Sequence, residues 1–148
     1  MNETKNKLAR DYAREKHKGQ FRFDGVTPYF SHVSEVADLV RGTFWTTDPE
    51  LLTNMVCAAY LHDVLEDTDT QPDEIEDIFG EDVRFIVEGL TKKTTETYEQ
   101  YISRINQNPI LSQIKVCDIL ANLGDSPSRK QVKKYSDTLR TLLLHPYE

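Results

Sequence analysis

One six-residue stretch of this chain combines an imidazole with three carboxylates. His62 and Asp63 are followed, after two apolar residues, by Glu66 and Asp67. The segment before the pair, Ala58–Leu61, has the composition of the buried end of a helix. Ionised side chains in an apolar setting need a partner or a metal, and imidazole and carboxylate are both common ligands of divalent metals. The stretch therefore predicts a binding site rather than a solvated helix face.

The spacing within this stretch restricts how it could bind an ion. Glu66 lies four residues after His62, and Asp67 four after Asp63, so on a continuing helix these side chains share a face. Three carboxylates so close repel one another unless a cation or a proton is present. Adjacent residues of a helix point about 100° apart, so His62 and Asp63 can reach one ion only at a seam between helices. Further ligands must come from other elements.

Two other residues are candidates for those ligands. His32 stands at the start of a predicted helix whose remaining face is apolar, and a core or capping histidine is the alternative interpretation. Asp118 lies between Cys117 and Ile119, where an unpaired buried carboxylate would be unfavourable. Asn122 follows one turn later on the same helix face, which favours a buried polar site over a surface position for Asp118.

Three segments of the chain, taken in order, resemble a known family. Residues 20–32, 62–68 and 115–122 resemble the hydrolase domain of RelA/SpoT-type alarmone enzymes, within the HD phosphohydrolase superfamily. The chain length is similar to that of the small stand-alone hydrolases. The resemblance implies an all-α fold and a Mn²⁺-dependent hydrolase that removes the 3′-pyrophosphate of guanosine tetra- or pentaphosphate.

The resemblance also implies a metal site. His32, His62, Asp63 and Asp118 would hold the ion. Two imidazoles and two carboxylates form a mixed nitrogen and oxygen set that suits Mn²⁺ or another divalent first-row metal and leaves positions open for water and substrate. Such a site needs no covalent nucleophile.

Five further residues acquire roles by the same resemblance. Glu66 and Asp67 would position or deprotonate the attacking water. Asn122 would contact the nucleotide sugar or phosphate, Arg22 would pack on or bond to the base, and Tyr135 would contact the nucleotide. The intact acidic pair favours an enzyme over a non-catalytic nucleotide-binding module of the same fold, which is one alternative.

Three positions depart from the family pattern. Ile119 and Ala121 replace a basic residue and an aromatic or histidine in the third segment, and Phe23 replaces a second basic residue of the long members. None of these changes removes a metal ligand, but they remove groups placed to contact a nucleotide. A second alternative is therefore hydrolysis of another nucleotide, as an NADPH phosphatase or an adenosine-alarmone hydrolase.

Composition limits the class of partner. The net charge of −7 disfavours a long nucleic acid, whereas a small phosphorylated nucleotide needs only a local basic patch or a bound cation. No apolar run approaches the roughly 20 residues of a membrane span, and the N-terminus lacks the apolar core of a secretory signal. Cys57 and Cys117 follow no disulfide pattern and are expected to be reduced core residues. We therefore expect a cytoplasmic protein.

The elements that must position these residues are expected to be helices. Apolar residues recur at helical spacing throughout the 148 residues, which predicts one all-α domain, a helical bundle over 1–148. Ser31 is the expected N-cap of the helix that carries His32, and Asp48 that of the helix leading to the His-Asp pair. The predicted helices cover about 3–18, 31–42, 49–62, 72–79, 82–90, 94–106, 110–123 and 128–144.

Some marked residues receive simpler interpretations. His17 and His145 are expected to be exposed at helix ends. Phe44 and Trp45 predict a hydrophobic staple or a contact in a homo-oligomer. The basic residues of the last helix could be a solvated face or could bind phosphate; they are Arg129, Lys130, Lys133 and Lys134.

Overall fold

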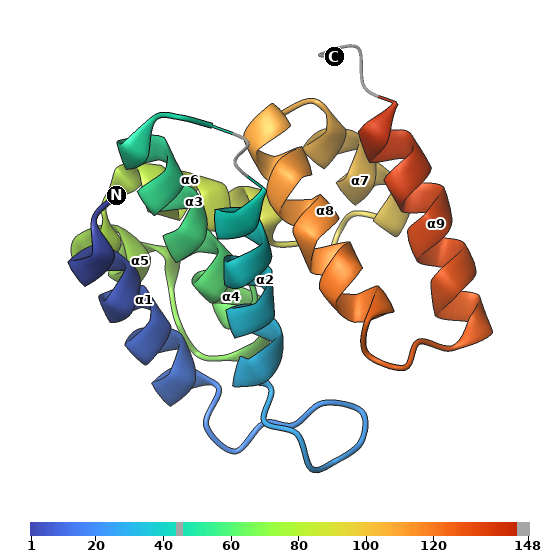
Figure 1. The fold of residues 1–148 in the computed structure, drawn as a ribbon, viewed down its shortest axis with the longest axis horizontal. Coiled ribbons are helices and arrows are strands. Elements are labelled where there is room, and N and C mark those ends of the chain that lie inside the picture. Colours follow the sequence, from blue (N-terminus) through green and yellow to red (C-terminus); the bar gives the residue numbers. More distant parts are fainter. Residues whose placement is uncertain (44–45, 145–148) are drawn as a thin grey trace.

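Helices follow one another along the chain in the computed structural model, which describes residues 1–43 and 46–144 (Figure 1). The helices are α1 (Glu3–Lys16), α2 (Phe30–Gly42), α3 (Pro49–Leu61), α4 (Val64–Asp67), α5 (Pro72–Phe79), α6 (Glu81–Leu90), α7 (Tyr98–Asn106), α8 (Pro109–Leu123) and α9 (Arg129–Leu143). Within the described residues the β-structure is an isolated bridge between Phe21 and Pro28. The prediction of an all-α fold is confirmed.

Helix α3 forms the centre of the core. Every residue from Thr53 to Leu61 is buried, because α1, α2 and α6 all pack against this helix. A helix that is apolar on nearly every side must be covered in this way. Helix α2 also packs against α8, so the ends of α2, α3 and the middle of α8 converge. Both cysteines are free and buried, as expected.

Local sequence explains where most helices begin. Asp48 caps α3 as predicted, with its carboxylate accepting from the backbone N–H groups of Glu50 and Leu51. The N-cap predicted at Ser31 is wrong, because the chain enters α2 two residues earlier and Tyr29 occupies that position. Helix α7 begins later than predicted because Thr97 forms a capping box.

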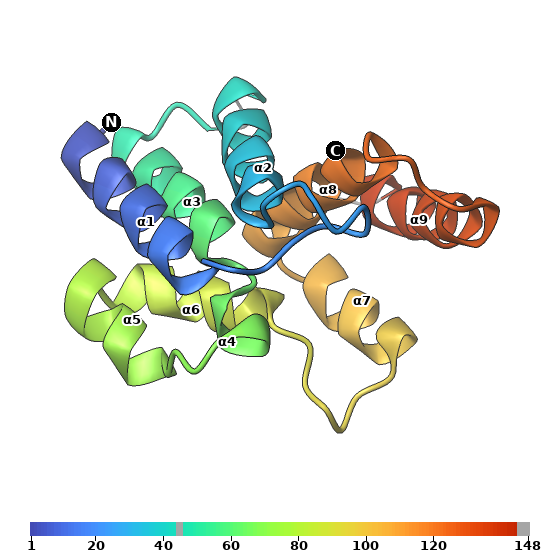
Figure 2. The same ribbon diagram turned by 90° about the horizontal axis from the view of Figure 1, so that it is seen from below.

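The outer side of the fold consists of α7 and α9, both of which pack against α8 (Figure 2). Phe44 and Trp45, predicted as a staple or an oligomer contact, lie outside the described residues, as does His145. Among the helices described, none combines the length and the apolar character that crossing a membrane requires.

The packing of α5 gives a stability prediction. Phe79 is 2% exposed and meets the Tyr12 ring edge-on at 5.6 Å between centroids, so Phe79→Ala should lower the free energy of unfolding by about 3–5 kcal/mol. Ile78 is the neighbouring residue and is 41% exposed. Ile78→Ala, compared in the same urea titration, should cost much less. Equal losses in the two variants would contradict this account of the core.

Candidate metal centre

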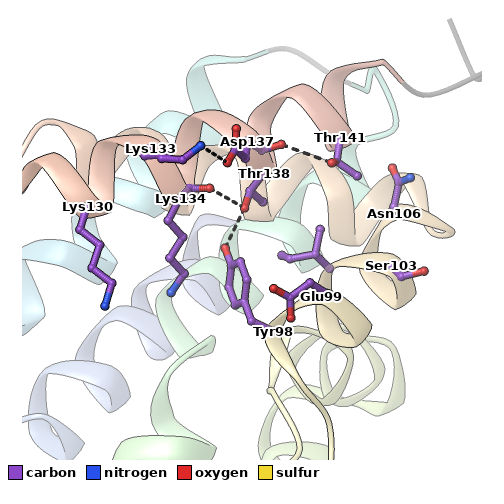
Figure 3. Close-up of a pocket in the computed structure, with 11 residues that line it drawn as sticks. Tyr98, Glu99, Ser103, Asn106, Lys130, Lys133, Lys134, Asp137, Thr138 and Thr141 are labelled. Atoms are coloured by element: carbon purple, nitrogen blue, oxygen red, sulfur yellow. Dashed lines mark hydrogen bonds and ion pairs between the residues drawn. The ribbon is translucent and has the colours of Figure 1, made fainter.

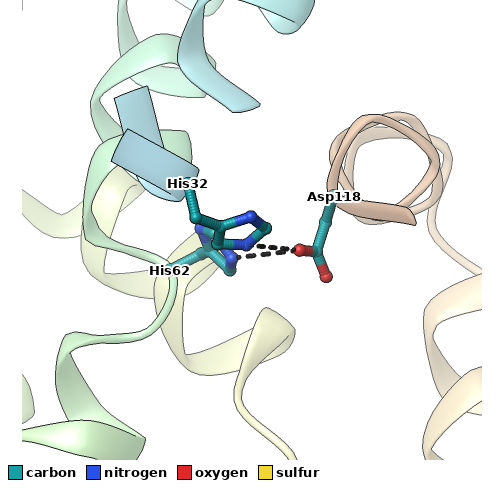
Figure 4. Close-up of side chains that lie close together, drawn as sticks. All are labelled: His32, His62 and Asp118. Carbon is teal, nitrogen blue, oxygen red and sulfur yellow. Dashed lines mark ion pairs between the residues drawn. The ribbon is translucent and has the colours of Figure 1, made fainter. Parts of the chain in front are cut away.

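Three buried side chains from separate elements converge on one point (Figure 4). His32 comes from α2, His62 follows α3, and Asp118 comes from α8. Each offers a ligand atom within 4.8 Å of the others. The Asp118 Oδ1 atom lies 2.9 Å from His32 Nε2 and 3.4 Å from His62 Nε2. The structure thus brings together three of the four predicted metal ligands in a geometry that could hold a divalent cation.

The fourth predicted ligand, Asp63, lies beside this cluster. Its Oδ2 atom is 3.0 Å from His62 Nε2 and 3.8 Å from His32 Nε2. The helix predicted over 49–62 ends at Leu61, within one residue of the expected end, and α4 begins at Val64. The turn between them lets adjacent residues approach the same point, which an unbroken helix would prevent.

The environment of His62 fits a metal ligand. Its Nδ1 atom lies 2.7 Å from the carbonyl oxygen of Ala59, so this nitrogen carries the proton that it donates. The Nε2 atom is buried and has no hydrogen-bond partner among the described residues, yet the carboxylates of Asp63 and Asp118 face it. Two carboxylates facing this atom call for a positive charge between them, either a bound cation or a proton on Nε2. Burial opposes protonation, but Asp63 and Asp118 outweigh it and raise the pKa of His62.

Asp118 is held from its other side by a lysine. Lys115 Nζ lies 2.6 Å from Asp118 Oδ2, while the Asn122 amide donates to Oδ1 at 3.3 Å. Burial would raise the pKa of Asp118, but the charge of Lys115 and the hydrogen bond from His32 hold it well below its usual range. Asp118 therefore stays ionised, with Oδ1 directed at the two histidines.

Tyr29 orients Asp63. Its hydroxyl donates to Asp63 Oδ2 at 2.6 Å, and its ring lies 5.6 Å from that of His32 between centroids. Removing a group that holds a metal ligand in place commonly changes metal affinity about 10–100-fold. Tyr29 thus joins the site although the sequence indicated no role for it.

We expect Tyr29→Phe to weaken metal binding by about 10–100-fold while the fold persists. The measurement is a metal titration by calorimetry on protein stripped with a chelator. Tyr12→Phe is the matched control, since its hydroxyl donates instead to Glu74 on α5, at 2.6 Å. A loss of affinity in the control as large as that in Tyr29→Phe would refute the specific role of Tyr29.

The two predicted water-handling carboxylates differ in position. Glu66 lines a cavity of about 190 Å³ together with His62, Asp63 and Asp118, and its Oε1 atom accepts from the Lys92 backbone N–H at 2.6 Å. Desolvation and the neighbouring charges of Asp63 and Asp67 raise the pKa of Glu66. Asp67 is outside the lining of this cavity, although desolvation and Asp63 raise its pKa too. Glu66 is therefore the better placed of the two.

The predicted nucleotide contacts Arg22 and Asn122 are brought together. The Arg22 guanidinium donates to Asn122 Oδ1 at 3.0 Å and to Asp125 Oδ2 at 2.7 Å. It also lies 5.5 Å from the centre of the Phe23 ring, which is 83% exposed. Tyr135 is half-buried on α9 and does not line the 190 Å³ cavity.

Burial corrects one interpretation from the sequence and agrees with another. Ile119 and Ala121 are 0% and 1% exposed, so as they stand in this chain they face the core and contact no ligand. His17, expected to be exposed, is 2% exposed, and its Nδ1 atom pairs with Gln20 Oε1 at 2.8 Å. Of the three departures from the family pattern, Phe23 alone lies where it could meet a ligand.

Sequence reasoning missed four residues with polar groups that line the same cavity. Lys92, Tyr98 and Tyr101 lie between the recognised segments, and Lys115 lies inside the third. Lys134 lines the cavity too, and it belongs to the basic set for which phosphate binding was one alternative. The position of Lys115, three residues before Asp118, is the one signal that could have revealed it, because i and i+3 share a helix face.

Fold and site together define an all-helical protein with a buried histidine-aspartate cluster suited to a divalent metal. The HD domain family model matches residues 9–145, and the chain belongs to this family.

Curated relatives carry a specific activity in their names. The chain is 42% identical over 123 residues to guanosine-3′,5′-bis(diphosphate) 3′-pyrophosphohydrolase MESH1 of Xenopus tropicalis, and 40% identical to that of Homo sapiens. Each match covers 79% of this chain and 66% of the relative. A solved structure, described as a metazoan ortholog of SpoT that hydrolyzes ppGpp, matches with a TM-score of 0.76 and 27% identity, covering 94% of this chain and 83% of that one.

Proposed function

We propose that this protein is a metal-dependent pyrophosphohydrolase that removes the 3′-pyrophosphate from guanosine 3′,5′-bis(diphosphate) or a closely similar alarmone. The observation that carries the proposal is the buried cluster of His32, His62 and Asp118 with Asp63 beside it. His62, Asp63 and Asp118 share one cavity with Glu66. The activity named for the relatives supports the choice of substrate.

We assign the metal to His32, His62, Asp63 and Asp118, and propose Mn²⁺ as the ion. The mixed nitrogen and oxygen donor set supports a divalent first-row metal. When bound, such an ion lowers the pKa of a coordinated water and neutralises charge on phosphate oxygens.

The residues of the chain would then carry out a balanced hydrolysis. The water oxygen forms a bond to the phosphorus attached to the ribose 3′ oxygen, and the bond between that phosphorus and the 3′ oxygen breaks. Glu66, with Asp67 in support, accepts a proton from the water, and the 3′ oxygen regains a proton as it leaves. The products are guanosine 5′-diphosphate and pyrophosphate. The raised pKa of Glu66 makes its carboxylate a better proton acceptor.

Three residues would position the nucleotide. Arg22 would pack on or bond to the base. Its guanidinium is already held by Asn122 and Asp125, so little ordering would be needed, although only 7% of its side chain is exposed. Asn122 bonds both Arg22 and Asp118, and therefore links the base contact to the metal centre. Tyr135 would contact the nucleotide from α9.

The test is to supply purified protein with Mn²⁺ and guanosine 3′,5′-bis(diphosphate) and to measure pyrophosphate release. Turnover that disappears with a chelator and returns with Mn²⁺ would support the proposal. Faster turnover of NADPH or of an adenosine alarmone would show that another nucleotide is the substrate. The exposed Phe23, which stands in place of a basic residue, supports that alternative. Nucleotide binding without turnover would favour a non-catalytic module.

A further inference from the structure

A second cavity adjoins the metal-centre cavity on its α9 side. It measures about 500 Å³ and lies between α7 and α9, with Ile102, Lys130 and Thr138 among its lining residues (Figure 3). Tyr98 and Lys134 line both this cavity and the 190 Å³ cavity of the metal centre. The two spaces therefore meet at these two side chains. We call the larger one the α7–α9 groove.

The wall between the two cavities is fixed in place. The Tyr98 hydroxyl lies 3.0 Å from the Thr138 hydroxyl. The Thr138 hydroxyl in turn donates to the Lys134 carbonyl oxygen at 3.0 Å. The Lys134 amine lies 4.1 Å from the centre of the Tyr98 ring and 5.6 Å from that of Tyr135. This arrangement holds an ammonium group at the junction by packing against aromatic faces.

The charge around Lys134 favours an anion. Among the described residues, no carboxylate forms an ion pair with its amine, whereas the neighbouring Lys133 amine pairs with Asp137 at 3.3 Å. Figure 3 shows Lys130 and Lys134 extending from α9 in the same direction, while Lys133 turns toward Asp137. Desolvation, followed by the charges of Lys115 and Lys130, lowers the pKa of Lys134, and the opposite charge of Glu99 has a smaller effect.

A substrate phosphorylated at two separate positions matches this layout. One phosphorylated arm must reach the metal centre for hydrolysis, and a compact nucleotide would place its other arm some distance away. We propose that the α7–α9 groove binds the second phosphorylated arm of the substrate, with Lys134 contacting its phosphate at the junction. This inference rests on the proposed function, and it makes the groove a determinant of selectivity for doubly phosphorylated nucleotides.

Lys134→Met tests the inference against two substrates. Guanosine 3′,5′-bis(diphosphate) carries both arms, and guanosine 3′-diphosphate with a free 5′-hydroxyl carries only the reacting one. The variant should raise KM for the first about tenfold or more, since a charge-assisted bond to phosphate is lost, and leave KM for the second nearly unchanged. Lys134→Arg keeps the charge and should restore most of the affinity.

Lys133→Met is the matched control, because it removes the same charge from the same helix but from an amine already paired with Asp137. Equal effects of Lys133→Met and Lys134→Met, or equal effects of Lys134→Met on the two substrates, would overturn the inference. Both variants are at exposed positions, and their thermal unfolding midpoints report whether the fold is intact.

Calorimetric binding of the two nucleotides in a Glu66→Gln background separates this inference from the proposed function. Suppose that the natural sequence turns over neither nucleotide, but Lys134→Met weakens binding of the doubly phosphorylated one alone. The proposed hydrolase activity is then wrong, and the proposed binding role of the α7–α9 groove is supported. If turnover is present and nucleotide binding does not depend on Lys134, the proposed activity stands and the proposed role of the groove is wrong. Absence of both turnover and binding overturns both.

Discussion

Asp118→Ala is expected to abolish metal binding and to lower kcat/KM by at least about 10³-fold. The variant removes a carboxylate whose Oδ1 atom lies within 3.4 Å of both histidine Nε2 atoms. A catalytic metal supplies several kcal/mol of transition-state stabilisation, which corresponds to a loss of about this size. Metal content measured by mass spectrometry and pyrophosphate release measured on the same sample test the two halves of the prediction.

Two further variants make this prediction sharper. Asp118→Ala also leaves Lys115 without its carboxylate partner, so part of any loss could reflect instability. Asp118→Asn keeps the size of the side chain and should still lose the metal, because a neutral amide is a weaker ligand. Asp77→Ala, at an exposed position on α5, should change neither quantity. Full metal occupancy in Asp118→Ala would show that the cluster is not the metal centre.

Glu66→Gln is expected to lower kcat by about 10²–10⁴-fold while the metal content stays unchanged, since the change removes a proton acceptor and not an assigned ligand. The amide oxygen of glutamine can still accept from the Lys92 backbone N–H, so the side chain should keep its place. Single-turnover measurements with Mn²⁺ present would isolate the hydrolytic step.

Asp67→Asn provides the comparison within the acidic pair. Because Asp67 does not line the cavity that contains Glu66, its loss should reduce kcat less. Loss of metal in Glu66→Gln would make Glu66 a ligand instead of a base. A larger effect at Asp67 than at Glu66 would reverse the roles assigned to the two carboxylates.

The sequence allowed the fold class and the metal cluster to be predicted for different reasons. Helical periodicity is a local property, so elements such as the one capped by Asp48 could be placed within a few residues. The approach of His32, His62 and Asp118 could not be derived from spacing, since they lie on different helices. It was expected because three segments resembled a family, and in the structure the ligand atoms of these residues lie within 4.8 Å of one another.

The parts that failed depend on tertiary packing. The N-cap of α2 predicted at Ser31 is two residues late, because the chain already turns into this helix at Tyr29. His17 was expected to be exposed at a helix end, but Gln20 and the Tyr29 ring, which lie outside α1, contact it and it is 2% exposed. Tyr29 acts on Asp63 through a contact between distant segments, which no local pattern records.

The convergence of α2, the end of α3 and α8 on one ion has a consequence for folding. A cation bound by His32, His62 and Asp118 would act as a cross-link between segments far apart in the chain, present only in the native state. At a free concentration of one hundred times Kd, such a ligand adds about 2.7 kcal/mol to the free energy of unfolding. Metal scarcity would then lower the amount of folded protein as well as its activity, so the supply of the ion would set both together.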